Sequence, residues 1–550
     1  MDDSEYARLF EKAVSLHKQR QITDAKRLFE QLLVVRPQDH NARYRLGILL
    51  HGLGHFDKAL ECIEKALDQA SDRLEYRYAR GAFLQGLGRV AEAIDEYDRV
   101  ISTNPRIPEV HAFLGSAHEQ TGAHAKAIAA FERALALRPE YPEVYNELGN
   151  VYTATGDAAR ARACYERALE LKPGYADPNN NLGTLLHNQR DFKAAILHYR
   201  KAIESCPTYT KARFNLAIAL RDSGDLEQAK TECRQILARE PSNVEAHVQL
   251  SFCLLQEKNF EEGWKEHEWR LKVPGITTRK LEKPLWKGED ISKKTVYVYH
   301  EQGLGDTIQF LRYIPLLATR CQRILLRVQN ELNPLMRGQE LPAEIVPPER
   351  SDEELDYDVH IPLMSMPMMF KEMPVSARYI VPDQHKVSGY RQRFSHTGVK
   401  VGVFWCGNPS FKRNKYRAIT LAALAPLFDL PRISWYSLQK GQGSEELHQA
   451  QSSLVDLGST FADFSDTAAA LENLDLLITT DTAIAHMSGA LGRPTWLLLD
   501  IAPDWRWGTS GEESYWYPSV RLFRQTRPLD WTDVISRVRS ALRELTSGSG

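Results

Sequence analysis

Cysteine, net charge and long apolar runs are all scarce in this sequence of 550 residues. Its seven cysteines are scattered without a C-x-x-C pair, which excludes a disulfide framework or zinc knuckle and indicates a reducing compartment. The 70 Lys and Arg residues nearly balance 72 Asp and Glu residues, so the chain carries no general basic field for nucleic acid. The longest aliphatic clusters, such as residues 496–499, are too short to span a membrane. Because residues 1–5 are acidic and do not begin a signal sequence, we expect a soluble, cytoplasmic protein.

A pattern with a period of 34 residues fills the first half of the chain, starting at Tyr6. Small residues recur at repeat positions 8 and 20, a larger and mostly apolar residue at position 24, and proline at position 32 in most repeats. Small residues let two antiparallel helices approach closely, and the proline ends the second helix. The pattern resembles that of tetratricopeptide (TPR) repeats. About eight of them are expected to stack into an α-solenoid, a superhelix with a long concave groove.

The first helix of each repeat is expected to line this groove. Position 5 is mostly aromatic in early repeats and asparagine in later ones. It supplies the candidate residues for binding a partner in the groove: Tyr44, Tyr78, Asn146, Asn180 and Phe214. Rings can cover apolar side chains of an extended peptide, and amides can bond its backbone. The alternative is that several of these rings pack between neighbouring helices. We predict a protein partner in the groove without identifying it.

After residue 294, short β-rich runs alternate with helical stretches. The runs are 295–299, 323–328, 400–405, 433–438, 475–480, 495–499 and 520–523. Such alternation predicts parallel sheets covered by helices, here two Rossmann-like lobes with a cleft between them. The predicted division is a TPR domain (1–275), a linker (276–293), an N-terminal lobe (294–385), a C-terminal lobe (386–546) and a flexible tail (547–550). The degenerate eighth repeat is expected to cap the array or to dock it onto the α/β lobes.

The turn after the first of these strands, EQGLGD at residues 301–306, is the first candidate site segment. Its paired glycines, Gly303 and Gly305, allow a tight turn with the backbone close to a ligand. A helix is predicted over residues 308–317, which places Asp306 at or just inside its start. Asp306 is then either an N-cap or first-turn carboxylate, or a general base at the cleft.

The strand at 475–480 leads into DTAIAH, residues 481–486, at the start of another predicted helix. Exposed N–H groups there, with the Thr482 hydroxyl, predict an anion site for phosphates. His486 could reach the same ligand, or it could be a partly buried helical histidine. Two loops, 405–417 and 438–441, face this point and carry cations that suit a phosphate leaving group, unless some of them are solvated surface residues.

Residues from about 264 to 545 resemble the GT-B glycosyltransferase domain that follows TPR arrays in bacteria, and are similar to ADP-heptose:lipopolysaccharide heptosyltransferases. The matching segments are 301–306, 309–310 with 312–313, 407–409, 438–441, 481–486 and 502–507. The resemblance implies that Asp306 deprotonates the acceptor hydroxyl, with Glu301 as a second catalytic residue, and that no metal or other cofactor is required. The implied nucleotide-sugar-binding residues are Gly303, Gly305, Asn408, Lys412, Lys415, Arg417, Gln439, Lys440, Asp481, Thr482, Ala483 and His486.

Two features depart from the heptosyltransferase pattern. Ala483 stands where that family has glycine, and the spacing of the lysine loop leaves Lys412 and Lys415 as rival phosphate contacts. A D-x-D triplet at 356–358 leads into a short apolar run, and we interpret it as the entry to a strand rather than a metal site.

The combination of repeats and GT-B domain also resembles protein O-glycosyltransferases, both O-GlcNAc transferase and bacterial flagellin glycosyltransferases. We therefore predict an inverting, metal-independent glycosyltransferase that moves a sugar from a nucleotide-sugar to Ser or Thr of a protein, with flagellin as a candidate acceptor. The alternatives are a saccharide or lipid-linked acceptor, and a catalytically inactive TPR scaffold. The donor could be a CMP-nonulosonic acid, a UDP-hexosamine or an ADP-heptose.

Overall fold

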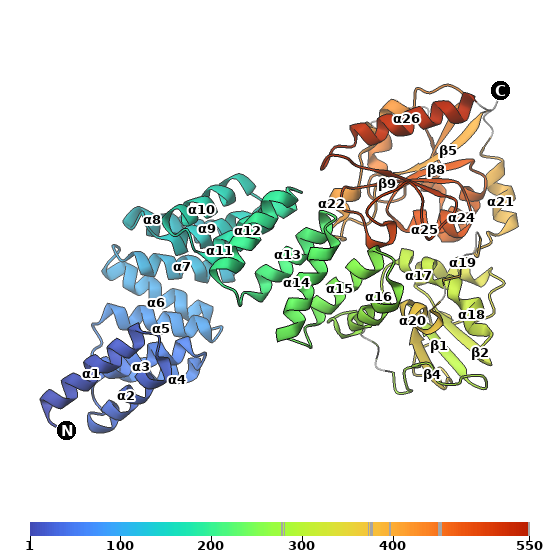
Figure 1. The fold of residues 1–550 in the computed structure, drawn as a ribbon. Helices are drawn as coiled ribbons and strands as arrows, with labels where there is room; N and C mark the ends of the chain where they lie inside the picture. The colour runs from blue at the N-terminus through green and yellow to red at the C-terminus, as the bar shows by residue number, and fades with distance from the viewer. Residues whose placement is uncertain are drawn as a thin grey trace. The chain divides into compact units, whose positions relative to one another are not determined.

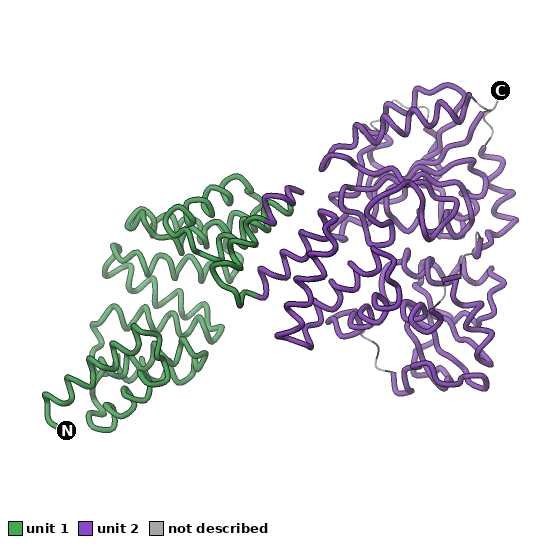
Figure 2. Tube along the Cα trace, viewed as in Figure 1, with its two compact units in different colours: residues 1–189, 197–209 green, residues 190–196, 210–550 purple. Residues whose placement is uncertain are grey.

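The computed structural model describes residues 1–276, 279, 281–371, 373–374, 378–394, 398–448 and 454–547. Residues 277, 278 and 280 of the predicted linker, and residues 548–550 of the predicted tail, lie outside the described residues. The chain forms two compact units (Figure 2). The first comprises Met1–Gln189 and Leu197–Tyr209, and the second comprises Arg190–Ile196 and Thr210–Gly550.

Residues 1–267, all of them described, form sixteen helices, two per repeat (Figure 1). Their bounds are α1 (Asp3–Lys18), α2 (Ile22–Val35), α3 (His40–Gly52), α4 (Phe56–Gln69), α5 (Leu74–Gly86), α6 (Val90–Thr103), α7 (Pro108–Gln120), α8 (His124–Leu137), α9 (Pro142–Ala154), α10 (Ala158–Leu171), α11 (Ala176–Asn188), α12 (Phe192–Ser205), α13 (Thr210–Asp222), α14 (Leu226–Arg239), α15 (Val244–Gln256) and α16 (Phe260–His267). The predicted solenoid is therefore confirmed. A short 3₁₀ helix, Glu268–Lys272, follows α16.

The small residue at position 8 lies against the large residue at position 24 of the same repeat. A Cβ atom on Gly149 would lie 2.5 Å from Cε1 of Tyr165, closer than van der Waals packing allows. The same clash arises at three more pairs: Gly81 with Tyr97, Gly115 with Phe131, and Gly183 with Tyr199. Glycine therefore lets the two helices of a repeat approach closely, as the pattern predicts.

The first sheet of the α/β region has the order β3-β2-β1-β4, and the strand pairs in its ladders are parallel. Its strands and helices are β1 (Thr295–Tyr299), α17 (Leu304–Phe310), α18 (Ile314–Ala318), β2 (Arg323–Arg327), α19 (Asn333–Arg337), β3 (Glu344–Ile345), β4 (Val359–Pro362) and α20 (Met366–Phe370). Val296 and Val298 of β1 belong to the main core, whereas Tyr297 and Tyr299 pack on the other face with Tyr357. Because successive side chains of a strand point to opposite faces, both faces of β1 make apolar contacts.

The second sheet has the order β10-β9-β8-β5-β6-β7, again with parallel pairs. In chain order this is the 3-2-1-4-5-6 arrangement of a dinucleotide-binding fold. Its elements are α21 (Gln384–Arg391), β5 (Val399–Phe404), α22 (Asn414–Arg417), α23 (Leu421–Leu424), β6 (Ile433–Ser437), β7 (Val455–Asp456), α24 (Phe464–Glu472), β8 (Leu476–Thr480), α25 (Ala483–Ala490), β9 (Thr495–Leu499), β10 (Val520–Arg524) and α26 (Thr532–Ser547). The predicted α/β region of two Rossmann-like sheets is confirmed.

The helix predicted over 308–317 differs in the structure. α17 begins earlier, at Leu304, and a 3₁₀ turn at Leu311–Tyr313 separates it from α18. Pro315 lacks an N–H group and its ring would collide with the carbonyl four residues earlier, so the helix is interrupted there. Asp306 consequently lies in the first turn of α17.

The eighth repeat shares a core with the α/β region inside the second unit. Trp264 of α16 is 5% exposed and packs edge-to-face against Phe310, Trp505 and Trp516. These rings come from both sheets' flanking segments and lie in one continuous apolar cluster. The degenerate repeat therefore docks onto the α/β region, one of the two roles expected of it.

Candidate functional site

The topology of both sheets gathers the predicted site segments. In open parallel sheets, ligands bind beyond the carboxyl ends of the strands where the strand order reverses. In the first sheet that point lies between β1 and β4, and residues 301–306 follow β1. In the second sheet it lies between β5 and β8, which lead into residues 405–417 and 481–486. α17 packs directly against α25, so the two switch points meet (Figure 1).

Asp306 is held from two sides. Its Oδ2 accepts a hydrogen bond from the Gly303 N–H at 2.9 Å, which makes it a first-turn carboxylate of α17. Its Oδ1 accepts from Nη2 of Arg506, on the far lobe. Burial raises the pKa of Asp306, and Arg506 opposes that rise. The carboxylate is thus both a first-turn residue and part of an ion pair that joins the two lobes.

Arg506 is the centre of this charge cluster, and the sequence did not single it out. It is 9% exposed and lies in the 3₁₀ turn Trp505–Trp507. Besides Asp306, its guanidinium reaches Asp504 at 2.8 Å and Oε1 of Gln309, and it stacks on the Trp505 ring at 4.3 Å. The only sequence signal was its place in the matching segment 502–507.

The start of α25 presents Thr482 as its N-cap residue, 7% exposed. His486 lies one turn further on, 6% exposed, and its Nδ1 shares a hydrogen bond of 2.9 Å with the Tyr517 hydroxyl. Burial, assisted by Arg506, lowers the pKa of His486 to about 3, so the ring is neutral at pH 7. His486 is therefore a buried helical histidine that bonds to Tyr517, and its contact with a ligand stays a prediction.

Gly305 is needed for contact between the lobes. A Cβ atom at this position would lie 2.8 Å from Cδ2 of His486 and 3.6 Å from the Cα of Ala483. Gly303, by contrast, is exposed and serves as the N-cap of α17. The two glycines of the turn thus have different roles, and Gly305 brings α17 close to the start of α25.

The 405–417 loop reaches the same point through two residues. A Cβ atom on Gly407 would lie 3.1 Å from Cγ2 of Thr482, and Nη1 of Arg417 lies 3.9 Å from Oδ2 of Asp481. Burial and the neighbouring Asp504 raise the pKa of Asp481. The remaining predicted residues of the loop, Asn408, Lys412 and Lys415, are exposed.

The 438–441 loop supports its neighbours. The Gln439 side chain is buried, accepts the N–H groups of Trp405 and Cys406 at 3.1 Å each, and donates to the Cys406 carbonyl at 2.8 Å. Lys440 Nζ donates to the carbonyls of Phe461 and Ala462. Gln439 therefore orders the start of the 405–417 loop, and Lys440 is bonded to the carbonyls that precede α24.

Glu301 lies in a separate buried ion pair. Its Oε2 is 2.9 Å from Nη2 of Arg270 and accepts the Met364 N–H at 3.3 Å. Burial raises the pKa of Glu301, and Arg270 counteracts the rise. Arg270 also donates to the Ser365 hydroxyl at 2.8 Å. Glu301 thus connects the segment after β1 to Met364 after β4 and to Arg270, which follows the last repeat.

In the first unit, the aromatic candidates of the groove pack against rings of other helices. Tyr44 lies 4.6 Å from the Tyr76 ring centroid, and Tyr78 lies 6.1 Å from that of Phe113. In the second unit, Phe214 is half-buried. The rings therefore take part in helix packing, the alternative considered above, while Tyr44 and Tyr78 keep part of their surface exposed.

The asparagines form a ladder between α9 and α11. Asn181 Nδ2 donates to Oδ1 of Asn146 at 3.0 Å and to Oδ1 of Asn150 at 2.9 Å, and Asn180 Nδ2 donates to Oδ1 of Asn181 at 3.2 Å. Asn146 and Asn150 in turn donate to the carboxylate of Glu147. Asn146 and Asn180 are 3% and 1% exposed, so both amides of this network are buried.

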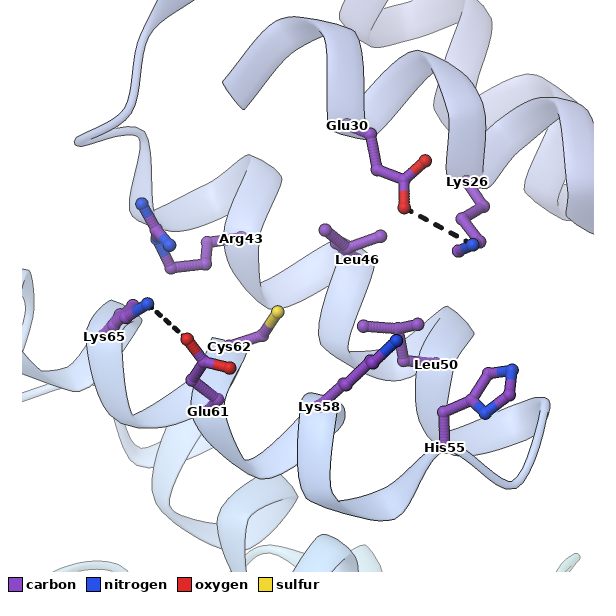
Figure 3. A pocket seen from close by; sticks show the side chains of 10 residues that line it. All are labelled: Lys26, Glu30, Arg43, Leu46, Leu50, His55, Lys58, Glu61, Cys62 and Lys65. Atoms are coloured by element: carbon purple, nitrogen blue, oxygen red, sulfur yellow. Dashed lines mark hydrogen bonds and ion pairs between the residues drawn. The ribbon is translucent and has the colours of Figure 1, made fainter. Parts of the chain in front are cut away.

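A cavity of about 270 Å³ lies on the repeats between α2, α3 and α4 (Figure 3). Four of its charged groups form two ion pairs, each along a single helix: Lys26 with Glu30 at 3.4 Å on α2, and Lys65 with Glu61 at 2.5 Å on α4 (Figure 3). It belongs to the first unit, whereas the predicted phosphate site belongs to the second. None of the residues that line it is a predicted site residue.

Two further observations concern metals and membranes. Across the described ranges, no group of three or more His, Cys, Asp or Glu side chains is arranged to hold a metal ion. Asp358 of the D-x-D triplet accepts the Thr295 N–H at 2.7 Å, at the entry to β4. Every helix in the described part of the chain is too short or too polar to cross a bilayer.

Comparison with known sequences identifies the repeats. Family models described as tetratricopeptide repeat match residues 16–83 and 220–263, 78–142, 140–208 and 198–231. Protein FlbA of Caulobacter vibrioides is 27% identical over 323 residues, which are 52% of this chain and 53% of FlbA. The chain therefore matches about half the length of this curated relative.

Similar solved structures include the APC/C hetero-tetramer Cut9–Hcn1, with 19% identity, 49% of this chain and 53% of that chain covered, and a TM-score of 0.41. TTC0263, a thermophilic TPR protein of Thermus thermophilus, has 25% identity over 33% of this chain and 98% of its own, with a TM-score of 0.31. These scores are too low to support a function. The chain is a tetratricopeptide-repeat protein with a C-terminal α/β region of two parallel sheets.

Proposed function

We propose that the α/β region is an inverting, metal-independent glycosyltransferase that moves a sugar from a nucleotide-sugar to Ser or Thr of a protein. The observation that carries the proposal is the meeting of two switch points, with Asp306 from one lobe beside the start of α25 from the other. An acid–base group and an anion site at the junction of two Rossmann-like sheets suit group transfer from a nucleotide.

Asp306 is the proposed base. It takes the proton of the acceptor hydroxyl as the oxygen attacks the anomeric carbon, and the bond from that carbon to the phosphate oxygen breaks. The bonding electrons leave with the phosphate. Arg417, Arg506 and the N–H groups at the start of α25 stabilise the departing charge. An inverting displacement of this kind places base and leaving group on opposite sides of the sugar, consistent with their origin in different lobes.

Arg506 connects donor binding to the base. In the structure its guanidinium pairs with Asp306, which keeps that carboxylate less basic. A phosphate that draws Arg506 away removes this opposition and raises the pKa of Asp306. Binding of the donor therefore makes Asp306 a stronger base, which can then deprotonate the acceptor hydroxyl.

The repeats supply the acceptor in this proposal. TPR arrays are protein-binding surfaces, and holding a polypeptide near the α/β region raises the local concentration of its hydroxyl groups. Flagellin is the first acceptor to test, because of the resemblance to flagellin glycosyltransferases. A catalytically inactive scaffold is the second candidate, favoured by the close packing of α17 on α25 and by the ion pair between Asp306 and Arg506.

Binding of ADP, UDP, GDP, CMP and CDP, measured by calorimetry, tests the proposal. We expect one nucleotide to bind the wild type and Asp356→Asn, which alters an exposed carboxylate before β4, and to bind His486→Ala much more weakly. At about 100 times its dissociation constant it should stabilise the protein by about 2.7 kcal/mol. No binding by any of the five contradicts the proposed activity and favours the scaffold. Transfer to a saccharide but not to a protein would contradict the proposed acceptor.

A further inference from the structure

The turn inside each repeat contains one residue in the left-handed region of the backbone. Repeat position 15 has a positive φ throughout: Arg20, Gly54, Gly88, Gly122, Gly156, Arg190, Gly224 and Lys258. Glycine adopts this conformation without steric cost, whereas a side chain makes it unfavourable. Arg20 and Lys258 belong to the first and last repeats. Arg190, with φ of 65°, is the exception within the array.

The side chain of Arg190 explains why glycine is absent there. It is 4% exposed, whereas Arg20 and Lys258 are exposed. Its Nη2 lies 2.6 Å from Oδ2 of Asp500, and its guanidinium lies 3.8 Å from the centroid of the Tyr416 ring. Asp222 at 3.7 Å is a second anionic neighbour. A buried arginine with two anionic partners and a stacked ring is a specific contact, not a solvated surface cation.

Two of these three partners of Arg190, Tyr416 and Asp500, belong to the segments that form the proposed donor site. Tyr416 lies in α22, and the adjacent Arg417 faces Asp481. Asp500 directly follows β9 and begins the segment that continues to Asp504 and Arg506. All of these residues lie in the second unit together with Arg190. One guanidinium thus connects the 405–417 loop to the segment that holds Arg506.

We propose that Arg190 is a positioning residue of the donor site, which fixes the 405–417 loop and the 500–507 segment so that Arg417 and Arg506 face an anionic nucleotide ligand. The nature of this ligand rests on the proposed function, whereas the ordering of the two segments does not. Arg190 acts through Tyr416 and Asp500 and does not touch the ligand. Where five other repeats have glycine, the sixth repeat therefore has Arg190, whose side chain contacts the α/β region.

Arg190→Gly separates positioning from folding. Glycine is the residue that five other repeats carry at this φ, so the variant relaxes the turn while it removes the side chain. Arg20→Gly makes the same exchange at the same repeat position on an exposed arginine and is the matched control. Arg190→Lys keeps the charge but loses the planar group that stacks and bonds in two directions.

Hydrogen exchange of the full-length variants is the first measurement. We expect Arg190→Gly to speed exchange in residues 405–417 and 500–507 while α1–α10 keep wild-type protection, and Arg20→Gly to change neither segment. The dissociation constant of the nucleotide found in the panel should rise about 2- to 30-fold for Arg190→Gly, with a smaller rise for Arg190→Lys. The donor KM should rise with it and kcat should fall, because Arg417 and Arg506 also stabilise the departing phosphate, while the acceptor KM stays close to wild type.

Wild-type exchange in both segments of Arg190→Gly overturns the proposal. So does a uniform loss of protection across the second unit with an unchanged dissociation constant, because that result assigns Arg190 to general stability alone. A wild type that binds no nucleotide contradicts the proposed function instead. The exchange measurement then still decides whether Arg190 orders the two segments.

Discussion

Glu119 makes the stability of the repeat array depend on pH. It lies on α7 at repeat position 12 and is partly buried, and burial, assisted by the negative charge of Glu147, raises its pKa from 4.5 to about 7. The folded array therefore holds this proton more tightly than the unfolded chain does. As a result, the free energy of unfolding falls as pH rises from about 4.5 to about 7, and the loss is complete above that range.

The size of the effect follows from the shift. At about 1.4 kcal/mol per pKa unit, a shift from 4.5 to about 7 costs the folded state at most about 3.5 kcal/mol. Partial exposure of the carboxylate screens its charge, which brings the expected cost to about 1–3 kcal/mol. Glu119→Gln removes the charge at nearly constant volume. The variant should be more stable than the wild type at pH 8 by this amount and nearly equal to it at pH 4.5.

Hydrogen exchange of α7 and α9 in wild type and Glu119→Gln, compared at pH 5, 6, 7 and 8, measures this difference locally. Local measurement is needed because long repeat arrays do not unfold in a single step. Comparing two proteins at each pH cancels the intrinsic pH dependence of exchange. Glu143→Gln, which breaks an exposed ion pair of 3.1 Å with Lys172, is the control and should cost no more than about 1 kcal/mol. A difference of the same size at pH 5 and pH 8 would refute the reasoning.

Four further substitutions test the packing and one buried ion pair. Gly149→Ala places a Cβ atom 2.5 Å from Tyr165 and should destabilise the fifth repeat by about 1–3 kcal/mol, measured by exchange of α9 and α10. Arg270→Ala leaves the Glu301 carboxylate buried without its cation and should cost about 3–5 kcal/mol in urea unfolding of the second unit. Adding Glu301→Gln should recover part of that loss, and no recovery would contradict the ion-pair account. Trp264→Ala removes the ring shared by repeat eight and the α/β region, with an expected loss of about 3–5 kcal/mol in the same unfolding assay.

The repeat architecture was predictable because one unit recurs with a fixed period. Gly149 and Tyr165 illustrate this, since their positions recur in four repeats with the same contact. The central strands were predictable because they are short, buried and apolar on both faces, as β8 shows. β3 and β7 have two residues each, too few to produce a pattern. The break before α18 is indicated in the sequence by Pro315, which lies within an otherwise helical run.

The candidate site was predictable in its segments but not in its contacts. Asp306 and Thr482 follow central strands, so topology alone brings their segments together. Arg506 lies 200 positions from Asp306, and no local pattern indicates that the two side chains form an ion pair. The contacts of Gln439 with residues 405 and 406 were not predictable either, because an amide side chain after a strand can bind a ligand or a neighbouring loop equally well. The role of Gly305 likewise depends on a histidine in the other lobe.

Transfer by Asp306→Asn is the measurement that tests the central claim most directly. The wild type and the variant are incubated with the donor that matches the preferred nucleotide and with flagellin, and the acceptor mass is followed over time. The account predicts that the wild type adds one sugar mass per modified Ser or Thr. Asp306→Asn should be slower by about 10²- to 10⁴-fold while it still binds the nucleotide. Transfer at the wild-type rate by Asp306→Asn would contradict the assignment of the base, and with it the proposed mechanism.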